Sequence, residues 1–185
     1  MLSETPSQTV RPVRRTLTNF YWVYGVTLLA FILDQLSKFG IEQNLGPYLS
    51  GKSTPLFAGL TFEYVKNSGA SYNFLRDVPW LFTIVAIVAA IGVIGYYQWQ
   101  GASGFWYKLS VGLILGGIIG NLSDRLFKGG YVTDFIHISW LGFFNVFNLA
   151  DSCISVAVAI VLLTTLLQGV NVRPARSKVK TDNSK

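Results

Sequence analysis

The sequence predicts an α-helical integral membrane protein: four transmembrane helices, with a small β-sheet and an interfacial loop on the outer membrane face. The first observation is composition, because a chain of 185 residues with 51% hydrophobic and only 13% charged side chains is too apolar for an ordinary soluble domain. The second is a set of apolar runs that approach the about 20 residues a helix needs to cross a bilayer. The third is a short segment of alternating side chains, typical of a half-buried strand. We expect one membrane-embedded domain over residues 1–185.

The transmembrane helices are predicted from four apolar runs, at residues 20–39, 80–99, 106–126 and 147–167. None is long enough to span the bilayer twice. The first run follows several arginines, as a secretory signal would, but no small-residue cleavage site comes after it and further spans do. We therefore expect the first run to be retained as a transmembrane helix.

Two longer connections, 40–79 and 127–146, fall on one side of the membrane in this arrangement. In the first, the segment LTFEYV at 60–65 alternates with a period of two, which predicts a strand and hence a small sheet in this outer loop. In the second, LGFFNVF at 141–147 predicts another extended or interfacial piece.

The orientation is predicted from the basic residues. Four spans put both termini on one side, and if that side is the cytoplasm, more than half of the 15 Lys and Arg residues lie inside. Only Glu4 and Asp182 oppose them there. We expect segment 1–19 and the basic tail 171–185 to be cytoplasmic, with the loops on the outer face.

Other partners are disfavoured by the same features. The net charge of +6 could suggest nucleic acid, but the basic residues sit at the ends of apolar runs and in the tail, with no basic and aromatic binding face. Cys153 and His137 are the only residues of their kinds, so a zinc site is hard to assemble. We expect no metal, no cofactor and no nucleic-acid partner, and a monomer surrounded by membrane lipid.

The third span carries a stripe of small residues. Gly112, Gly116 and Gly120 are spaced by four, the pattern that lets two membrane helices approach closely. Beside this stripe, Asn121 and Asp124 share a face at the outer end of the span. This face is predicted to point toward something polar.

Several acids near the outer interface have structural explanations of their own. Asp34 and Lys38 form a well-oriented i,i+4 ion pair, and Asp134 could be a turn residue. Asn148 can cap the fourth helix, with Asp151 in the first turn, where a carboxylate suits the helix dipole.

These explanations leave the convergence of the polar residues unexplained, because ionisable groups at a membrane interface are costly and usually functional. Two carboxyl groups held close together tend to share a proton, one acting as a base toward water and the other as an acid toward a carbonyl. That is the chemistry of aspartic proteases. The converging residues are Asp34, Asn121, Asp124, Asp134, Asn148 and Asp151.

Five short motifs, DQLSK, NSGA, GGIIGNLSDR, VTDF and FNLAD, resemble in order and spacing those of bacterial lipoprotein signal peptidase, also called signal peptidase II. The resemblance covers residues 33–155. It implies a four-span enzyme of the bacterial inner membrane, with its active site near the periplasmic face. That enzyme is an aspartic endopeptidase without a cofactor, which removes the signal peptide from a diacylglyceryl-modified prolipoprotein by cutting before the lipidated cysteine.

The resemblance also implies roles for individual residues. Its DF and NxAD motifs make Asp134 and Asp151 the catalytic pair. The positions that match residues shaping or supporting the family's site are Asp34, Lys38, Asn67, Gly69, Gly116, Gly120, Asn121, Asp124, Arg125, Asn148 and Ala150. The chain departs from the family's common Gly-Ala-Ala-Phe pattern, because Ser71 and Tyr72 follow Gly69 and Ala70.

Competing proteolytic schemes are weaker. Ser103, in a GASG segment, lies across the membrane from His137, so a nucleophile and its base could not meet. Ser37 and Lys38 are neighbours on a helix and point about 100 degrees apart, so they do not form a dyad. Within the acid cluster, Asp124 with Asp151 is the alternative dyad.

Two functions from other classes also remain. A small proton- or ion-coupled transporter could use the carboxylates, but a relay should distribute acids through the membrane depth, whereas here they crowd the outer edge. A structural assembly subunit would use the glycine face as its interface, and it leaves the acidic cluster unexplained.

Overall fold

The computed structural model describes residues 17–46, 50–69, 78–100, 104–140 and 146–170. Helices and strands follow one another along the chain as α1 (Leu17–Leu45), β1 (Ser53–Phe57), β2 (Leu60–Asn67), α2 (Pro79–Gln100), α3 (Phe105–Phe127), β3 (Val132–Ile138), β4 (Val146–Phe147) and α4 (Leu149–Val170). The four helices are long and apolar enough to cross a membrane. This confirms the predicted fold class.

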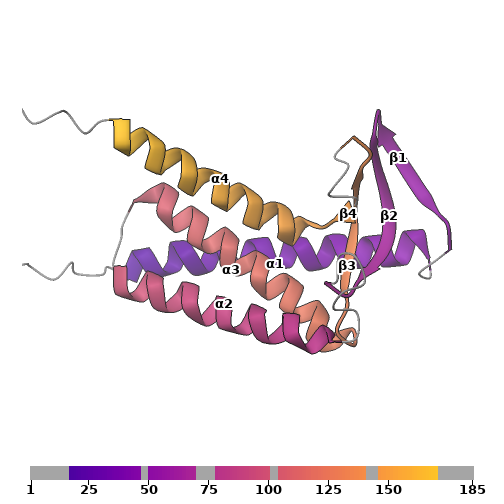
Figure 1. The fold of residues 1–185 in the computed structure, drawn as a ribbon, viewed down its shortest axis with the longest axis horizontal. Coiled ribbons are helices and arrows are strands. Elements are labelled where there is room, and N and C mark those ends of the chain that lie inside the picture. The colour runs from indigo at the N-terminus through magenta and orange to yellow at the C-terminus, as the bar shows by residue number, and fades with distance from the viewer. Residues whose placement is uncertain (1–16, 47–49, 70–77, 101–103, 141–145, 171–185) are drawn as a thin grey trace, which may run out of the picture.

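The helix α3 lies at the centre of the bundle and contacts each of the other three helices (Figure 1). Its glycines explain how. A Cβ atom at Gly112 would lie 2.7 Å from Cβ of Val26, and one at Gly116 would lie 2.6 Å from Cβ of Ala30. Because no side chain fits in these places, α1 and α3 pack with their backbones close together, as the small-residue stripe predicted.

The sheet lies at one end of the bundle, where α1 and α3 end and α2 and α4 begin (Figure 1). We refer to this as the sheet end. Its strand order is β1-β2-β3-β4, and every neighbouring pair is antiparallel. The predicted strand at 60–65 is confirmed as part of β2, whereas β1 and β3 were not predicted.

At the sheet end, two predicted helix boundaries were wrong by more than one residue. Val146 and Phe147 pair with β3, so the fourth helix begins at Leu149 rather than at residue 147. Residues 141–145 of the predicted interfacial piece lie outside the described residues. At the other boundary, α1 continues beyond residue 39 to Leu45 and ends before Gly46, whose φ of 73° suits a glycine.

The longer α1 places one more turn at the sheet end. Glu42 therefore follows Asp34 and Lys38 at intervals of four, which puts all three on one helix face. This face is directed toward α3 and β3, with which the sheet end of α1 is in contact.

Candidate active site

The polar residues predicted to converge do meet at the sheet end of the bundle. They come from α1, α3, β3 and the start of α4, which are distant in sequence. The most deeply buried are Asp34, Lys38, Asp124 and Asn148, each 0% exposed, and Asp134, 1% exposed. Buried polar groups of this kind need partners, and the hydrogen bonds around them supply most of these.

Asp134 lies on β3 beside an irregularity in the sheet. It pairs with Val65 of β2, and the register shifts between Val65 and Phe62. Both of its carboxylate oxygens accept hydrogen bonds: Oδ2 from Nδ2 of Asn67 at 2.7 Å, and Oδ1 from Nδ2 of Asn148 at 2.7 Å. A bulge of this sort re-aims a side chain, and here the carboxyl lies between two amides.

Asn67 is held in turn by the backbone that follows it. The N–H of Gly69 donates to Oδ1 of Asn67 at 2.7 Å, which leaves the amide nitrogen of Asn67 facing Asp134. Gly69 has a φ of 85°, and a Cβ there would lie 2.8 Å from Cδ2 of Phe82. Any other residue at this position would therefore be strained on both counts.

Asp151 lies in the first turn of α4, where Asn148 caps the helix. The N–H of Asp151 donates to Oδ1 of Asn148 at 3.0 Å, and the N–H of Asn148 donates to Oδ2 of Asp151 at 3.2 Å. These reciprocal bonds form a capping box and confirm the predicted cap. Oδ1 of Asp151 accepts from Nδ2 of Asn121 at 2.8 Å, so it faces the bundle interior.

Asn148 joins the two carboxyl groups. Its side-chain nitrogen donates to Asp134 and also to Oδ1 of Asn121, 3.0 Å away, while its backbone nitrogen donates to Asp151. The carboxyls of Asp134 and Asp151 are thus oriented from one residue, and their charges interact.

The protonation of Asp134 is strongly affected by this setting. Burial raises the pKa of Asp134 to about 7, and the nearby charge of Asp151 acts in the same direction. Hydrogen bonds from Asn67 and Asn148 and the charge of Lys38 oppose the rise without cancelling it. At neutral pH Asp134 therefore exists in both its acid and its carboxylate form, which suits proton transfer.

Lys38 is the cation at the centre of the cluster. Its Nζ lies 2.8 Å from Oδ2 of Asp34 and 3.1 Å from Oδ2 of Asp124, and it donates to Oδ1 of Asn121 at 3.0 Å. The predicted i,i+4 pair is confirmed, and Asp124 adds a second carboxylate from α3. Asp34 also accepts a 2.9 Å bond from the N–H of Ala150, which ties α1 to the first turn of α4.

Arg125 extends this charge network toward the catalytic candidates. Its guanidinium interacts electrostatically with the carboxylates of Asp151, Asp134 and Asp124, and Nη1 donates to the carbonyl of Asn121 at 3.4 Å. Its buried Nε has no hydrogen-bond partner among the described residues.

The competing Ser/Lys scheme is not supported by the geometry. Oγ of Ser37 donates to the carbonyl of Asp34 at 2.7 Å, while Lys38 is held among carboxylates. Ser103, Ala70, Ser71 and Tyr72 lie outside the described residues.

Four residues of the network were missed by sequence reasoning: Gln35, Glu42, Lys128 and Thr133. Gln35 donates to the carboxylates of Asp34 and Asp124 at 3.1 and 3.3 Å. Glu42 could have been identified from its i+4 spacing from Lys38, but the first helix was predicted to end at residue 39. No local signal identifies Thr133, because its partners come from α1, β2 and the end of α3.

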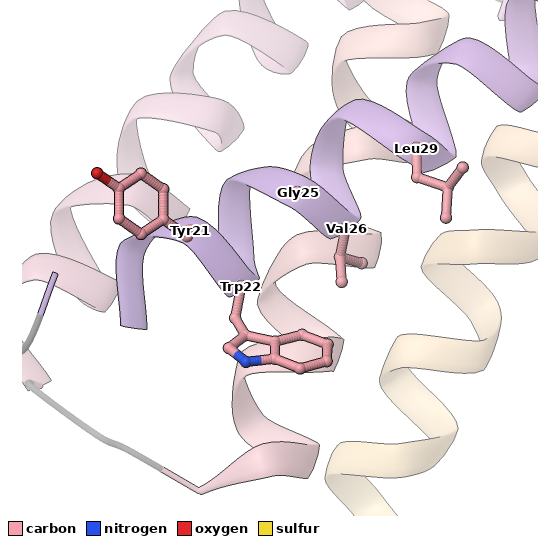
Figure 2. Close-up of a pocket in the computed structure, with 5 residues that line it drawn as sticks. All are labelled: Tyr21, Trp22, Gly25, Val26 and Leu29. Atoms are coloured by element: carbon pink, nitrogen blue, oxygen red, sulfur yellow. The ribbon is translucent and has the colours of Figure 1, made fainter. Parts of the chain in front are cut away.

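Apolar hollows of the molecule lie elsewhere. One of about 340 Å³ is lined by the α1 residues Tyr21, Trp22, Gly25, Val26 and Leu29 (Figure 2). Another of about 570 Å³ lies among α2, α3 and α4 near Tyr107 and Thr164. Neither is lined by a carboxylate, so neither belongs to the acidic cluster. Among the described residues, no group of three or more His, Cys, Asp or Glu side chains could hold a metal ion.

Most of the chain is similar in sequence to proteins of known family. A lipoprotein signal peptidase of Shewanella halifaxensis is 39% identical over 152 residues, which cover 79% of this chain and 86% of that protein. One of Syntrophomonas wolfei is 39% identical over 147 residues, which cover 79% and 93% respectively.

A solved structure of a bacterial membrane enzyme shares the fold, with a TM-score of 0.71 at 23% identity over 84% of this chain and 94% of that one. The family model of signal peptidase (SPase) II matches residues 26–167, a span that contains the whole cluster from Asp34 to Asp151. This multi-pass membrane protein therefore belongs to the signal peptidase II family.

Proposed function

We propose that this chain removes the signal peptide from prolipoproteins as an aspartic endopeptidase, with Asp134 and Asp151 as the catalytic pair. Family membership supports the substrate and the cleavage. The observation that supports the aspartic chemistry is the bridge from Asn148 to both carboxyl groups, together with a pKa of about 7 for Asp134.

The reaction follows from one protonated and one ionised carboxyl group. Asp151 takes a proton from a water molecule while the oxygen of that water attacks the scissile carbonyl carbon. Asp134 gives its proton to the carbonyl oxygen. When the tetrahedral intermediate collapses, the C–N bond breaks, the proton on Asp151 passes to the leaving nitrogen, and Asp134 recovers its proton. The net change is the addition of one water molecule across the peptide bond.

Asp124 is the weaker candidate for the pair. Its oxygens are engaged by Lys38 and Lys128, each 3.1 Å away, and by the N–H of Thr133 at 3.0 Å. A carboxylate between two ammonium groups is stabilised in its charged form and is a poor proton donor. Asp124 is better suited to supporting the site through Lys38.

We also infer that the substrate carries a diacylglyceryl cysteine just after the cleaved bond, and that the sheet end faces the periplasm with both termini cytoplasmic. Two acyl chains and the signal helix would hold the scissile bond near the membrane surface. If the two acids lie at the same depth, this anchoring raises the effective concentration of the scissile bond at the active site without further contacts between enzyme and substrate.

The transporter alternative is not supported by the family assignment. In the described residues, the acids of the network also gather at the sheet end instead of forming a path along the helices.

The proposal is tested with purified protein in lipid vesicles, given a diacylglyceryl-modified prolipoprotein and a matched precursor whose lipidated cysteine is replaced by serine. We expect cleavage of the lipidated precursor and almost none of the serine form. Equal cleavage of both precursors would refute recognition through the lipid. No cleavage of either, together with proton flux that depends on Asp134, would replace the peptidase with a transporter.

A further inference from the structure

Four polar side chains from four segments meet beside Asp134. We call them the Glu42 cluster: Glu42 of α1, Tyr64 of β2, Lys128 after α3, and Thr133 of β3. Oε1 of Glu42 lies 2.6 Å from Oγ1 of Thr133 and 2.6 Å from Nζ of Lys128. Nζ of Lys128 lies 3.1 Å from Oγ1 of Thr133, which closes a triangle, and Tyr64 is hydrogen-bonded to Thr133.

The hydroxyl of Thr133 is engaged by several partners in this cluster. A threonine hydroxyl has one proton to donate and two lone pairs. The proton goes to Glu42, and Lys128 donates to one lone pair. Tyr64 makes a further side-chain hydrogen bond with Thr133. Thr133 is 1% exposed, so water does not replace a hydrogen bond that this hydroxyl loses.

Lys128 is equally occupied. The three protons of its ammonium group are directed to Glu42, Thr133 and Oδ1 of Asp124, at 2.6, 3.1 and 3.1 Å. Burial acts to lower the pKa of Lys128, but the hydrogen bond to Glu42 and the charge of Asp124 outweigh it and raise the pKa. The cation therefore persists at neutral pH.

The cluster acts where the sheet's own hydrogen bonding is interrupted. The register between β2 and β3 shifts between Phe62 and Val65, so two residues of β2, one of them Tyr64, lie opposite Phe135 alone. A bulge leaves part of the ladder unpaired, and backbone pairing therefore holds β3 less firmly beside Asp134.

Thr133 links the cluster to Asp134. Successive side chains of a strand point to opposite faces. The hydroxyl of Thr133 is therefore directed to Glu42, while the carboxyl of the next residue, Asp134, is directed to Asn67 and Asn148. The N–H of Thr133 also donates to Oδ2 of Asp124 at 3.0 Å. The residue before Asp134 is thus fixed through both its side chain and its backbone.

We propose that the Glu42 cluster positions Asp134 for catalysis, with Glu42 and Thr133 as positioning residues that do not touch the substrate. This inference rests on the proposed function, in which Asp134 is one of the catalytic pair. A displacement of about 1 Å in a reacting group can lower the rate on the order of 100-fold, so a clamp on the neighbouring residue has a measurable effect on turnover.

The decisive variant is Thr133→Val, which keeps the shape and branching of the side chain and removes the hydroxyl. We expect kcat for the lipidated precursor to fall about 10- to 100-fold while KM changes little, because the carboxyl is misplaced but the substrate surface is intact. Thr133→Ser restores the hydroxyl and should return kcat to within about threefold of the unmodified enzyme. Glu42→Met should lower kcat like Thr133→Val, and the double variant should be no worse than either, because both remove the same clamp.

The matched control is Thr27→Val. Thr27 is also buried, at 8% exposed, and its hydroxyl lies 2.9 Å from the carbonyl of Val23 and 3.2 Å from that of Gly112. The same substitution there should lower the melting temperature and leave kcat unchanged. Tyr64→Phe, which removes only one hydroxyl, gives a second test if Thr133→Val does not accumulate, with an expected loss of kcat of about threefold.

Several outcomes would overturn the proposal: unchanged kcat in Thr133→Val or Tyr64→Phe, a serine variant as slow as the valine variant, or an equal loss of kcat in Thr27→Val. Asp134→Asn is measured in parallel to separate this inference from the proposed function. If Asp134→Asn is active, both the catalytic role of Asp134 and the positioning role of the Glu42 cluster are refuted. If Asp134→Asn is inactive but Thr133→Val is fully active, only the positioning role is refuted.

Discussion

Nδ2 of Asn148 lies 2.7 Å from Oδ1 of Asp134, and the backbone nitrogen of the same asparagine lies 3.2 Å from Oδ2 of Asp151. One residue thus sets the position of both carboxyl groups. In the proposed reaction the two acids act as a unit, so removing either should cost as much as removing both.

The first prediction concerns this unit. Asp134→Asn and Asp151→Asn should each lower kcat by about 10³-fold or more, because an amide cannot exchange the proton that the reaction requires. The double variant should be no slower than either single variant. The measurement is signal-peptide release from the lipidated precursor, with melting temperature and detergent-solution size as controls for folding. Near-normal turnover by either single variant would remove that residue from the proposed catalytic pair. If Asp124→Asn is inactive while Asp134→Asn is active, the role proposed for Asp134 belongs to Asp124.

The second prediction concerns pH. With a pKa of about 7 for Asp134, its protonated form is lost as the pH rises through 7. If that proton is given to the carbonyl oxygen, kcat/KM should fall about tenfold per pH unit above this value. The hydrogen bond from Asn67 stabilises the carboxylate and lowers the pKa of Asp134, so Asn67→Ala should raise it and move the alkaline limb to higher pH.

Asn44→Ala provides the control for this shift. Asn44 is exposed on α1 and donates to the carbonyl of Gly40. Its removal should leave the pH profile unchanged. An alkaline limb that stays in place or moves to lower pH in Asn67→Ala would show that Asp134 is not the titrating group of the free enzyme.

The parts of the structure that depend on local pattern could be predicted from the sequence. The capping of α4 by Asn148, the pair of Asp34 with Lys38 and the close approach of α1 and α3 at the glycines all follow from spacings within one helix. The strand at Leu60 could be identified by its alternation. In each case the interaction, or the face that makes it, is encoded within about one or two turns of the chain.

The remainder could not be predicted because it depends on pairing between distant segments. Val132–Ile138 is a strand because β2 lies beside it, and its position opposite Val65 is set by an irregularity that no local signal marks. Glu42 belongs to the site only because α1 continues for another turn at the sheet end. The engagement of Asp124 with Lys38 likewise required the packing of α3 on α1.

The third prediction concerns the buried cation. Lys38→Met leaves the buried carboxylates of Asp34 and Asp124 without their shared ammonium group, and should lower stability by about 3–5 kcal/mol, as the breaking of a buried ion pair does. Asp34→Asn should cost less, because Lys38 keeps its contact with Asp124. Lys52→Met, at an exposed position, should change stability by less than about 0.5 kcal/mol. Thermal unfolding in detergent measures all three, and a Lys38→Met enzyme as stable as Lys52→Met would mean that the cation does not hold the cluster together.

The last prediction tests how the close approach of α1 and α3 supports the site. A Cβ at Gly120 would lie 2.5 Å from Oδ2 of Asp34 and 3.1 Å from its Cγ. That carboxylate cannot move aside freely, because it is bound to Lys38 and to the N–H of Ala150. Gly120→Ala should therefore lower stability by about 1–3 kcal/mol, the usual cost of overpacking, and reduce activity by displacing α1 from the start of α4.

Gly95→Ala on α2 is the matched substitution, since nothing lies within 4 Å of a Cβ there. It should leave both stability and turnover unchanged. The comparison separates a packing effect from a general effect of adding a methyl group to a transmembrane helix. Equal behaviour of the two variants would mean that the helices can separate at Gly120 without moving Asp34, and that Lys38 and Ala150 do not hold its carboxylate in place.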